Sequence, residues 1–196
     1  MPLKVGVNGA GGRMGQRIVA LTMKDSDLSL AAALEWSGSP VLGRDAGEVA
    51  GSGHAGVPIT AVLGQHVDVI IDFSTPDGLK SVLPVCESRR IPLVVATTGI
   101  SVELRDAVLS AAQSTPIVMA PSMSVAVNLV MKLVAEAARV LRHNADGVDV
   151  EIIERHHRFK EDAPSGTALQ FVGLWRSRWV RIITYMDAMV GSDSVR

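Results

Sequence analysis

The segment EIIERHHRFKEDAPSGTAL, residues 151–169, concentrates titratable side chains directly behind an apolar run. His156 and His157 are adjacent, and Lys160 follows four residues after the first. Because successive side chains of a strand point to opposite faces, the two imidazoles are predicted to face different sides. Lys160 lies too far along to be a strand neighbour, but its long side chain can curl back into the same pocket.

The residues after Lys160 predict the beginning of a helix. Ser165 is a good N-cap behind Pro164, which places Gly166 and Thr167 in the first helical turn. A helix N-terminus offers unpaired N–H donors to a carboxylate. Together with the histidine and lysine side chains, these donors predict an electropositive pocket for a small dicarboxylate.

Two other interpretations of the adjacent histidines remain open. The pair can lie on a surface loop, solvated or paired with Glu154, Glu161 or Asp162. A Zn²⁺ site is the second alternative, although two histidines without a nearby cysteine are a weak signal. We therefore predict no metal site.

A glycine-rich stretch near the N-terminus, GAGGRMG at residues 9–15, is typical of a phosphate-binding turn. A strand leads into it and a helix leads out, so its N–H groups and the helix dipole can meet a pyrophosphate, with Arg13 lying along the phosphates. The alternative is a glycine turn that only packs the helix on the strand.

A second glycine-rich stretch, GSGHAG at residues 51–56, matches the G-x-G-x-x-G pattern of dinucleotide-binding turns more closely, but no strand precedes it and VPIT follows it where a helix should begin. We interpret it as a loop.

Glu35 is the candidate partner of the adenosine ribose. It ends a predicted strand twenty positions after Gly15, where a carboxylate accepts hydrogen bonds from ribose hydroxyls. The next residue is Trp36 rather than an arginine that would pair with a 2′-phosphate. This pattern favours NADH over NADPH, unless Arg44 or another cation intervenes.

Alternating strand and helix patterns predict an α/β protein with a doubly wound, Rossmann-type parallel sheet. The residues just beyond two further strands, TTG at 97–99 and APSM at 120–123, are then expected in the ligand cleft, with ordinary turn chemistry as the alternative. Predicted strands are LKVGV, LSLAAALE, VDVIIDF, PLVVAT and PIVMAP; predicted helices are RMGQRIVALTMK, DGLKSVLPVCESRR (kinked or restarted at Pro84) and SVELRDAVLSAAQS.

A second domain is predicted from a change of pattern between about Ala120 and Asn128. A helix follows whose apolar face is expected to consist of Leu129, Val130, Leu133, Val134, Ala137 and Leu141. GVDVEIIE then alternates apolar and charged residues, as a strand with one solvated side does. We expect a dinucleotide-binding domain at 1–124 and an incomplete α+β substrate domain at 125–196.

Composition excludes several classes of function. Hydrophobic residues make up 47% of the 196 residues and the formal charge is −1, so neither nucleic acid nor an anionic membrane is an expected partner. Cys86 is the single cysteine, which is compatible with a reducing compartment. No signal peptide precedes the first strand, and we expect a cytoplasmic protein.

The motifs GAGGRMG, DFSTPDG, ATTG and, above all, EIIERHHRFKEDAPSGTAL resemble the dihydrodipicolinate reductase family over about residues 1–170. The resemblance implies a two-domain oxidoreductase, usually a homotetramer, that reduces a cyclic unsaturated dicarboxylate with NAD(P)H in lysine biosynthesis. His156 would donate or accept a proton and Lys160 would donate one, while His157, Ser165, Gly166 and Thr167 would hold the substrate carboxylates. Implied cofactor contacts are Gly9, Ala10, Gly11, Gly12, Arg13, Met14, Glu35, Ala96, Thr97, Thr98, Ala120, Pro121, Ser122 and Met123.

The chain departs from the family pattern after about Gln170. Its tail, residues 171–196, holds two of the three tryptophans and several arginines, which indicates either a shifted reading frame or a divergent helix that pairs Trp175 with Trp179. Open sheet edges would then hinder a fully active tetramer. Two alternative functions follow: a relative that only binds dinucleotide, or a semialdehyde dehydrogenase that needs a thiolate, for which Cys86 in mid-helix is poorly placed.

Overall fold

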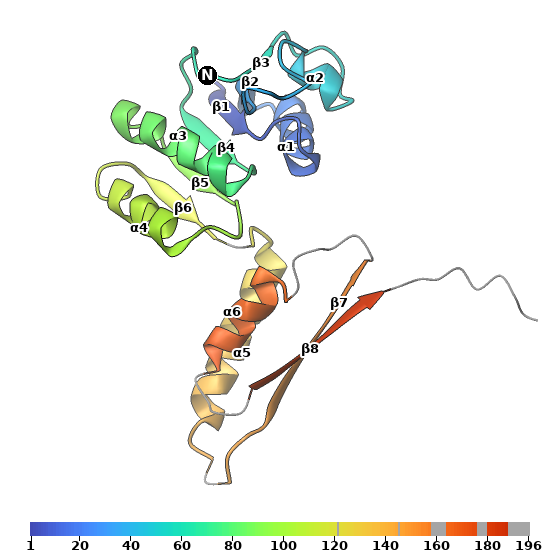
Figure 1. Ribbon diagram of the computed structural model, residues 1–196, viewed down its shortest axis with the longest axis vertical. Coiled ribbons are helices and arrows are strands. Elements are labelled where there is room, and N and C mark those ends of the chain that lie inside the picture. Colours follow the sequence, from blue (N-terminus) through green and yellow to red (C-terminus); the bar gives the residue numbers. More distant parts are fainter. Residues whose placement is uncertain (121, 145, 158–163, 176–179, 188–196) are drawn as a thin grey trace, which may run out of the picture. The chain divides into compact units, whose positions relative to one another are not determined.

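The chain forms two compact units, residues 1–121 and 122–196. The computed structural model describes residues 1–120, 122–144, 146–157, 164–175 and 180–187 (Figure 1). Lys160 and Pro121, both predicted to contribute to a site, lie outside the described residues.

The first unit is built on a six-stranded sheet with the order β3-β2-β1-β4-β5-β6, and every strand pair in it is parallel. Strands β2 and β3 extend the sheet from β1 toward one edge, and β5 and β6 extend it from β4 toward the other edge. The direction in which strands are added therefore reverses between the neighbours β1 and β4. This confirms the predicted doubly wound, Rossmann-type fold. The strands are β1 (Leu3–Asn8), β2 (Leu28–Leu34), β3 (Ile59–Thr60), β4 (Val69–Asp72), β5 (Leu93–Val95) and β6 (Ile117–Met119).

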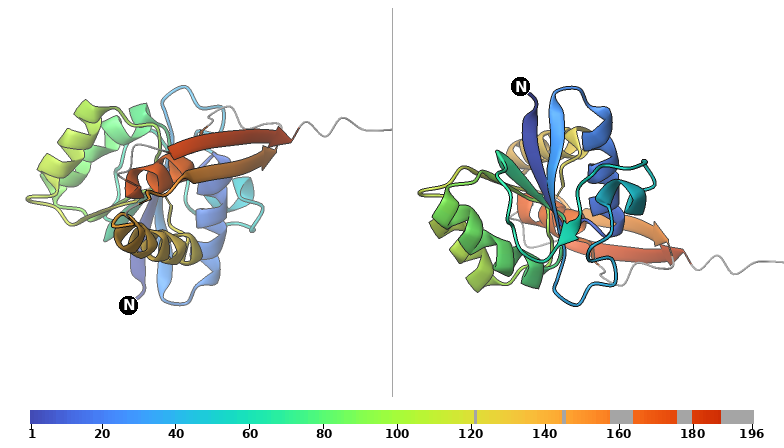
Figure 2. Two further views of the ribbon diagram at one scale, coloured as in Figure 1. Left: turned by 90° about the horizontal axis from the view of Figure 1, so that it is seen from below. Right: turned by 90° about the horizontal axis from the view of Figure 1, so that it is seen from above.

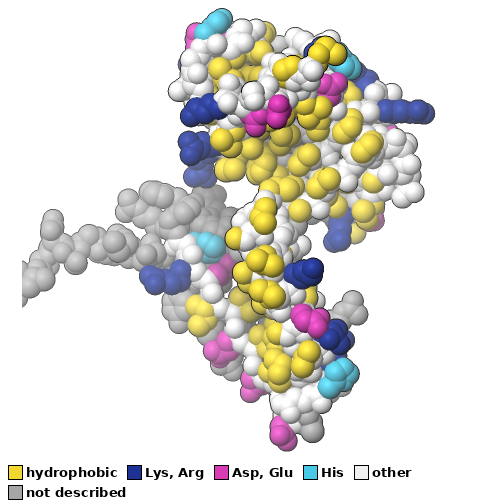
Figure 3. Space-filling model, turned by 180° about the vertical axis from the view of Figure 1, so that it is seen from behind, with side chains coloured by type: hydrophobic (Ala, Val, Ile, Leu, Met, Phe, Trp, Pro, Cys, Tyr) yellow, Lys and Arg dark blue, Asp and Glu magenta, His cyan; other side chains and the backbone are white. Residues whose placement is uncertain are grey.

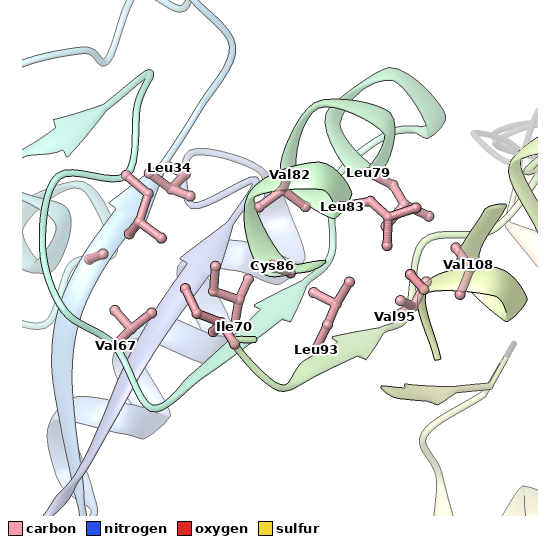
Figure 4. Packing of buried hydrophobic residues seen from close by; sticks show 14 residues of the cluster. Leu34, Val67, Ile70, Leu79, Val82, Leu83, Cys86, Leu93, Val95 and Val108 are labelled. Atoms are coloured by element: carbon pink, nitrogen blue, oxygen red, sulfur yellow. The ribbon is translucent and has the colours of Figure 1, made fainter. Parts of the chain in front are cut away.

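Helices cover both faces of this sheet (Figure 2). One hydrophobic cluster joins the strands to α1 and α2, through residues such as Val7, Val19 and Ala46. The other joins them to α3 and α4, and Figure 4 shows Val82 and Cys86 of α3 over Ile70 and Leu93 of the strands. The helices are α1 (Arg13–Lys24), α2 (Ala46–Val49), α3 (Pro76–Arg89) and α4 (Val102–Ala111).

Local sequence accounts for where these helices begin. The hydroxyl of Thr75 accepts a hydrogen bond from the N–H of Gly78 at the start of α3, and Ser101 does the same at the start of α4. Pro84 lies inside α3, which continues to Arg89 instead of restarting as the sequence allowed. The buried face of α3, with Leu79, Val82, Leu83 and Cys86, keeps the helix on the sheet although one backbone hydrogen bond is lost.

The second unit contains α5 (Val125–Leu141), β7 (Val150–His157), α6 (Gly166–Leu174) and β8 (Val180–Asp187). β7 and β8 pair in parallel, from Val150 opposite Val180 to His157 opposite Asp187. The segment 180–187 is therefore a strand, whereas one interpretation of the sequence made the tail a helix. The alternation of apolar and polar residues in 180–187 is too short to have identified this strand from the sequence. Trp175, which the helical interpretation paired with Trp179, is the C-cap of α6, and that helix ends at Leu174.

The apolar face predicted for α5 is largely exposed, which corrects the expectation from the sequence. Leu129, Val130, Leu133 and Leu141 are exposed, whereas Ala138 is buried. Hydrophobic side chains along the second unit are visible in the lower part of Figure 3. The 3.6-residue pattern identified the helix, but not which of its sides packs against α6. None of the described helices has the length and hydropathy needed to span a bilayer.

Candidate functional site

A pocket of about 400 Å³ opens at the carboxyl ends of the strands of the first unit. Its wall comes from three places: the turn after β1, the end of β2 with the residues behind it, and the start of α3. These are the ends at which the sheet order reverses, where α/β proteins bind their ligands. Glycines 9, 11 and 12 and Glu35 were predicted from the sequence, and they meet in this pocket.

The glycine-rich turn needs glycine for steric reasons. Gly9 has a φ of 80°, and a Cβ there would lie 2.6 Å from the carbonyl oxygen of Phe73. A Cβ on Gly15 would lie 1.9 Å from the carbonyl oxygen of Gly9, so α1 approaches β1 only without a side chain at that position. Gly12 is the N-cap of α1 and supplies no side-chain cap. The first-turn N–H groups therefore stay available to an anion.

Glu35 joins the end of β2 to the glycine turn. Its Oε1 accepts a hydrogen bond of 2.8 Å from the N–H of Gly11, and its Oε2 lies 3.3 Å from the N–H of Trp36. Trp36 is 67% exposed beside the pocket. The carboxylate is thus held at the wall of the pocket, between the glycine turn and the residue that follows it in the chain.

Several residues around the pocket were not identified from the sequence. Ser39, Pro40 and Val41 line it from the loop after β2, and Asn8, Phe73 and Ser74 line it from the ends of β1 and β4. The motif DFSTPDG contributed to the resemblance, yet its aspartate was not assigned a role. Asp72 is fully buried and binds Asn8, Ser74 and Thr97.

The predicted residues after β5 and β6 that the structure describes (96–98, 120, 122 and 123) lie outside the lining of this pocket. Thr97 is buried and its hydroxyl accepts a hydrogen bond from the N–H of Ser74, whereas Thr98 is exposed. The N–H of Ala120 donates a hydrogen bond to the carbonyl oxygen of Val95, and the carbonyl oxygen of Ser122 accepts one from the side-chain amide of Asn128. Ala10 and Ala96 are buried, while Arg13, Met14 and Met123 are exposed.

The stretch GSGHAG forms a loop behind α2, as predicted, and does not line the pocket. The carboxylate of Asp45 fixes the conformation of this loop. Its Oδ1 accepts hydrogen bonds from the N–H groups of Glu48 and Ala55, and its Oδ2 accepts one from the N–H of Val57. The bond from Ala55, the largest cause, outweighs partial desolvation and lowers the pKa of Asp45 to about 2. Asp45, Glu48 and His54 each place one potential metal-ligand atom within 4.8 Å of the others, a grouping that the sequence did not indicate.

The second unit brings Glu154, His156 and Ser165 together. Glu154 accepts hydrogen bonds from the N–H and the hydroxyl of Ser165, at 2.9 and 2.5 Å. The Nε2 atom of His156 lies 2.9 Å from Glu154, an ion-pair distance, but its N–H is not aligned for a hydrogen bond. Desolvation raises the pKa of Glu154, but the bonds from Ser165 and the contact with His156 outweigh it and lower that pKa to about 2.

His156 lies at ion-pair distance from Glu154, as one alternative allowed, but it does so from strand β7 and not from the surface loop which that alternative assumed. Ser165 is also the N-cap of α6, as predicted, because its hydroxyl accepts a hydrogen bond from the N–H of Ala168. Gly166 is exposed and Thr167 is half-buried in the first turn. The side chain of His157 lies outside the described part of the structure, as does Lys160.

Cys86 is unsuited to nucleophilic catalysis. Its side chain is buried on α3, and desolvation together with the negative charge of Asp72 raises its pKa to about 11. The thiol therefore stays protonated near neutrality, which argues against thiolate chemistry.

Comparison with solved structures agrees with the fold. Dipicolinate-bound dihydrodipicolinate reductase from Paenisporosarcina sp. TG-14 superposes with a TM-score of 0.70 at 23% identity, over 95% of this chain and 79% of that one. Aspartate semialdehyde dehydrogenase with NADP from Candida albicans reaches 0.50 at 14% identity, over 78% of this chain and 50% of that one. At these identities the likeness concerns the fold alone.

Comparison of sequences identifies the family. 4-Hydroxy-tetrahydrodipicolinate reductase from Rhodopirellula baltica is 47% identical over 175 residues, and the enzyme of that name from Methylococcus capsulatus is 47% identical over 173. Both matches cover 87% of this chain, which spans 62% and 63% of these relatives. The family model "Dihydrodipicolinate reductase, N-terminus" matches residues 3–123, and "Dihydrodipicolinate reductase, C-terminus" matches residues 126–187. The second match extends past Gln170, the residue after which the sequence analysis expected the chain to depart from the family pattern. The chain therefore belongs to the dihydrodipicolinate reductase family.

Proposed function

We propose that this protein reduces 4-hydroxy-tetrahydrodipicolinate to tetrahydrodipicolinate with a nicotinamide dinucleotide, in the route to diaminopimelate and lysine. The observation that carries the proposal is the pocket in which a side-chain-free helix N-terminus faces a carboxylate at the end of the next strand. The family membership and the names of the relatives supply the substrate. The Paenisporosarcina protein was solved with dipicolinate, a dicarboxylate, which supports an anionic ring as ligand.

NADH is the proposed preferred cofactor, with NADPH as the weaker one. Glu35 would repel a 2′-phosphate, and no lysine or arginine is among the described residues that line the pocket. The glycine turn would hold the pyrophosphate, with Gly9, Gly11 and Gly12 leaving room for it. The proposed domain boundary between residues 124 and 125 separates this cofactor site from the substrate residues.

The second unit would bind and protonate the substrate. When bound, the reduced nicotinamide supplies a hydride, and the negative charge that the ring receives must be quenched by a proton. Lys160 is the proposed donor of that proton, and His156 is proposed to donate or accept the proton that moves when the 4-hydroxyl group leaves as water. Glu154 would hold the imidazole of His156 in place, since it lies at ion-pair distance and is itself bound by Ser165. His157, Ser165, Gly166 and Thr167 would bind the carboxylates.

The direct test is NADH consumption with substrate generated by a coupled enzyme. Wild type should oxidise NADH faster than NADPH at equal concentrations, and the variants Lys160→Ala and His156→Ala should each lose most of the turnover while still binding NADH. Binding is measured separately, by NADH fluorescence titration. Undiminished turnover in both variants would place the chemistry elsewhere.

A second candidate function is dinucleotide binding without turnover. The observation that favours it is the small number of buried residues in the second unit: among those whose burial is described (122–144, 146–156 and 164–175), only Ala138, Ser165 and Ala168 are buried. The coupled assay separates the two, because this candidate binds NADH and consumes none. Light scattering on the same preparation tests our further proposal that this chain does not form the homotetramer usual for the family. We propose that the protein works in the cytoplasm.

A further inference from the structure

Asp72 is a fully buried carboxylate at the end of β4, between the ends of β1 and β5. Its Oδ1 accepts a hydrogen bond of 2.7 Å from the Nδ2 of Asn8 and one of 2.5 Å from the hydroxyl of Ser74. Its Oδ2 accepts one of 2.6 Å from the hydroxyl of Thr97. The carboxylate therefore connects the ends of the central strands with the residues that follow β4 and β5.

Both oxygens of Asp72 accept hydrogen bonds from neutral groups. The hydroxyl of Thr97 accepts a hydrogen bond from the N–H of Ser74 and donates one to Oδ2 of Asp72. An amide and two hydroxyls act as donors, and both carboxylate oxygens act as acceptors. Among the described residues, no lysine, arginine or histidine is bonded to it. An ionised Asp72 is a buried negative charge that such neutral dipoles stabilise.

The position of this charge relative to the pocket follows from the sheet order. In the proposed binding mode, Glu35 beyond β2 would hold the ribose and the glycine turn beyond β1 would hold the phosphates. A dinucleotide bound along the strand ends would continue over β4 and β5, so its nicotinamide half would lie on the side of Asp72. Ser74 and Asn8, which both bind Asp72, line the pocket themselves.

We propose that Asp72 is an electrostatic positioning residue that favours the oxidised cofactor over the reduced one. When the C4–H bond of NADH breaks and the hydride leaves with both electrons, the neutral ring becomes a cation. A buried negative charge stabilises that cation and not the neutral ring, so it assists hydride release. The inference rests on the proposed binding of a nicotinamide dinucleotide, and it assigns Asp72 no direct contact with substrate.

The test compares the dissociation constants of NAD⁺ and NADH on the full chain, measured by isothermal titration calorimetry. Asp72→Asn keeps the shape and removes the charge, so the ratio Kd(NAD⁺)/Kd(NADH) should rise by roughly threefold to tenfold. The matched control Thr97→Val removes one hydrogen bond and keeps the charge. This control should weaken the binding of NAD⁺ and of NADH by the same factor and leave the ratio of the two dissociation constants unchanged. The exchange Asn8→Asp with Asp72→Asn restores the charge across the same hydrogen bond, and should return the ratio toward that of the wild type.

Each outcome of this test decides something. An equal loss of affinity for both cofactor forms in Asp72→Asn would overturn the inference and leave Asp72 a structural residue. Asp72→Ser is prepared in parallel; if neither charge-free variant folds by circular dichroism while Thr97→Val does, the carboxylate is a folding element and the inference falls as well. Wild-type protein that binds neither NADH nor NAD⁺ would instead refute the proposed function itself.

Discussion

The two units of the molecule differ in how far their own residues bury one another. In the first unit, strands such as β1 and β4 and the helices α1 and α3 contribute fully buried side chains to two clusters, one on each face of the sheet. In the second unit, among the residues whose burial is described (122–144, 146–156 and 164–175), only Ala138, Ser165 and Ala168 are buried. Apolar packing on both faces of a sheet therefore holds the first unit, whereas the contacts described in the second unit are a two-stranded ladder, helix caps and the bonds of one carboxylate.

The largest expected effect tests this contrast with one leucine from each unit. Leu79→Ala removes a fully buried side chain of α3 and should cost about 2–5 kcal/mol of unfolding free energy. Leu133→Ala removes an exposed side chain of α5 and should stay within about 0.5 kcal/mol. Urea unfolding followed by circular dichroism measures both. Similar losses in the two variants would show that α5 is covered in solution.

Glycine substitutions should act in opposite directions in the two units. Gly15→Ala places a Cβ 1.9 Å from a backbone oxygen, so α1 must shift, at about 1–3 kcal/mol and with weaker NADH binding. Gly173→Ala, inside α6, meets no atom within 4 Å and should stabilise that helix by roughly 0.5–1 kcal/mol. Thermal unfolding and NADH titration provide the readouts. A stabilising effect of Gly15→Ala would contradict the close approach of α1 to β1.

Ser165 should be the most sensitive polar residue of the second unit. Ser165→Ala removes the N-cap of α6 and a hydrogen bond to Glu154, and should cost about 1 kcal/mol. Ser124→Ala is the matched control, because that exposed cap of α5 makes only one hydrogen bond of 3.4 Å to the N–H of Val127. Hydrogen exchange of the amides in α6 detects the difference. Equal protection in both variants would argue against the role of Ser165 as the anchor of α6.

The smallest expected effect is a pH dependence of the second unit. The pKa of Glu154 is about 2 when folded and has an ordinary value of 4.5, so the unfolded chain takes up the proton first as the pH falls. The stabilising contribution of Glu154 is therefore complete above about pH 4.5 and is lost progressively toward pH 2. Hydrogen exchange of β7 and α6 should follow this loss, and Glu154→Gln should remove it. Asp45 titrates in the same window, so exchange must be measured locally rather than for the whole chain.

Local patterns were sufficient for much of the first unit and for the glycine turn. The apolar sequences of β1 and β4 are typical of strands that are covered on both faces. The spacing from Gly15 to Glu35 predicted which carboxylate lies beside the glycine turn. Gly15 could be identified because the backbone oxygen that excludes a Cβ there belongs to Gly9 in the same turn, whereas the oxygen that excludes a Cβ at Gly9 belongs to the distant Phe73. Ser165 was identified for the same reason, since a cap is a contact between near neighbours.

The network around Asp72 could not be predicted from local patterns. Asn8 and Asp72 are 64 residues apart, and Thr97 follows Asp72 by 25. Asn8 and Asp72 look like ordinary strand-end residues in the sequence, and Thr97 was predicted as a cofactor contact rather than as a partner of Asp72. The pairing of β7 with β8 and the exposed side of α5 were missed for a similar reason, because periodicity identifies an element but not its neighbour.

The sequence by itself determined most strands and helices of the first unit, their order and the glycine-rich turn, because these depend on hydrophobic period and on backbone sterics within the turn. Only the tertiary structure decided which strand ends meet, and with them the burial of Asp72 and the contact of Glu154 with His156. Burial and charge environment are properties of side chains brought together from distant positions. They exist only once the sheet has assembled.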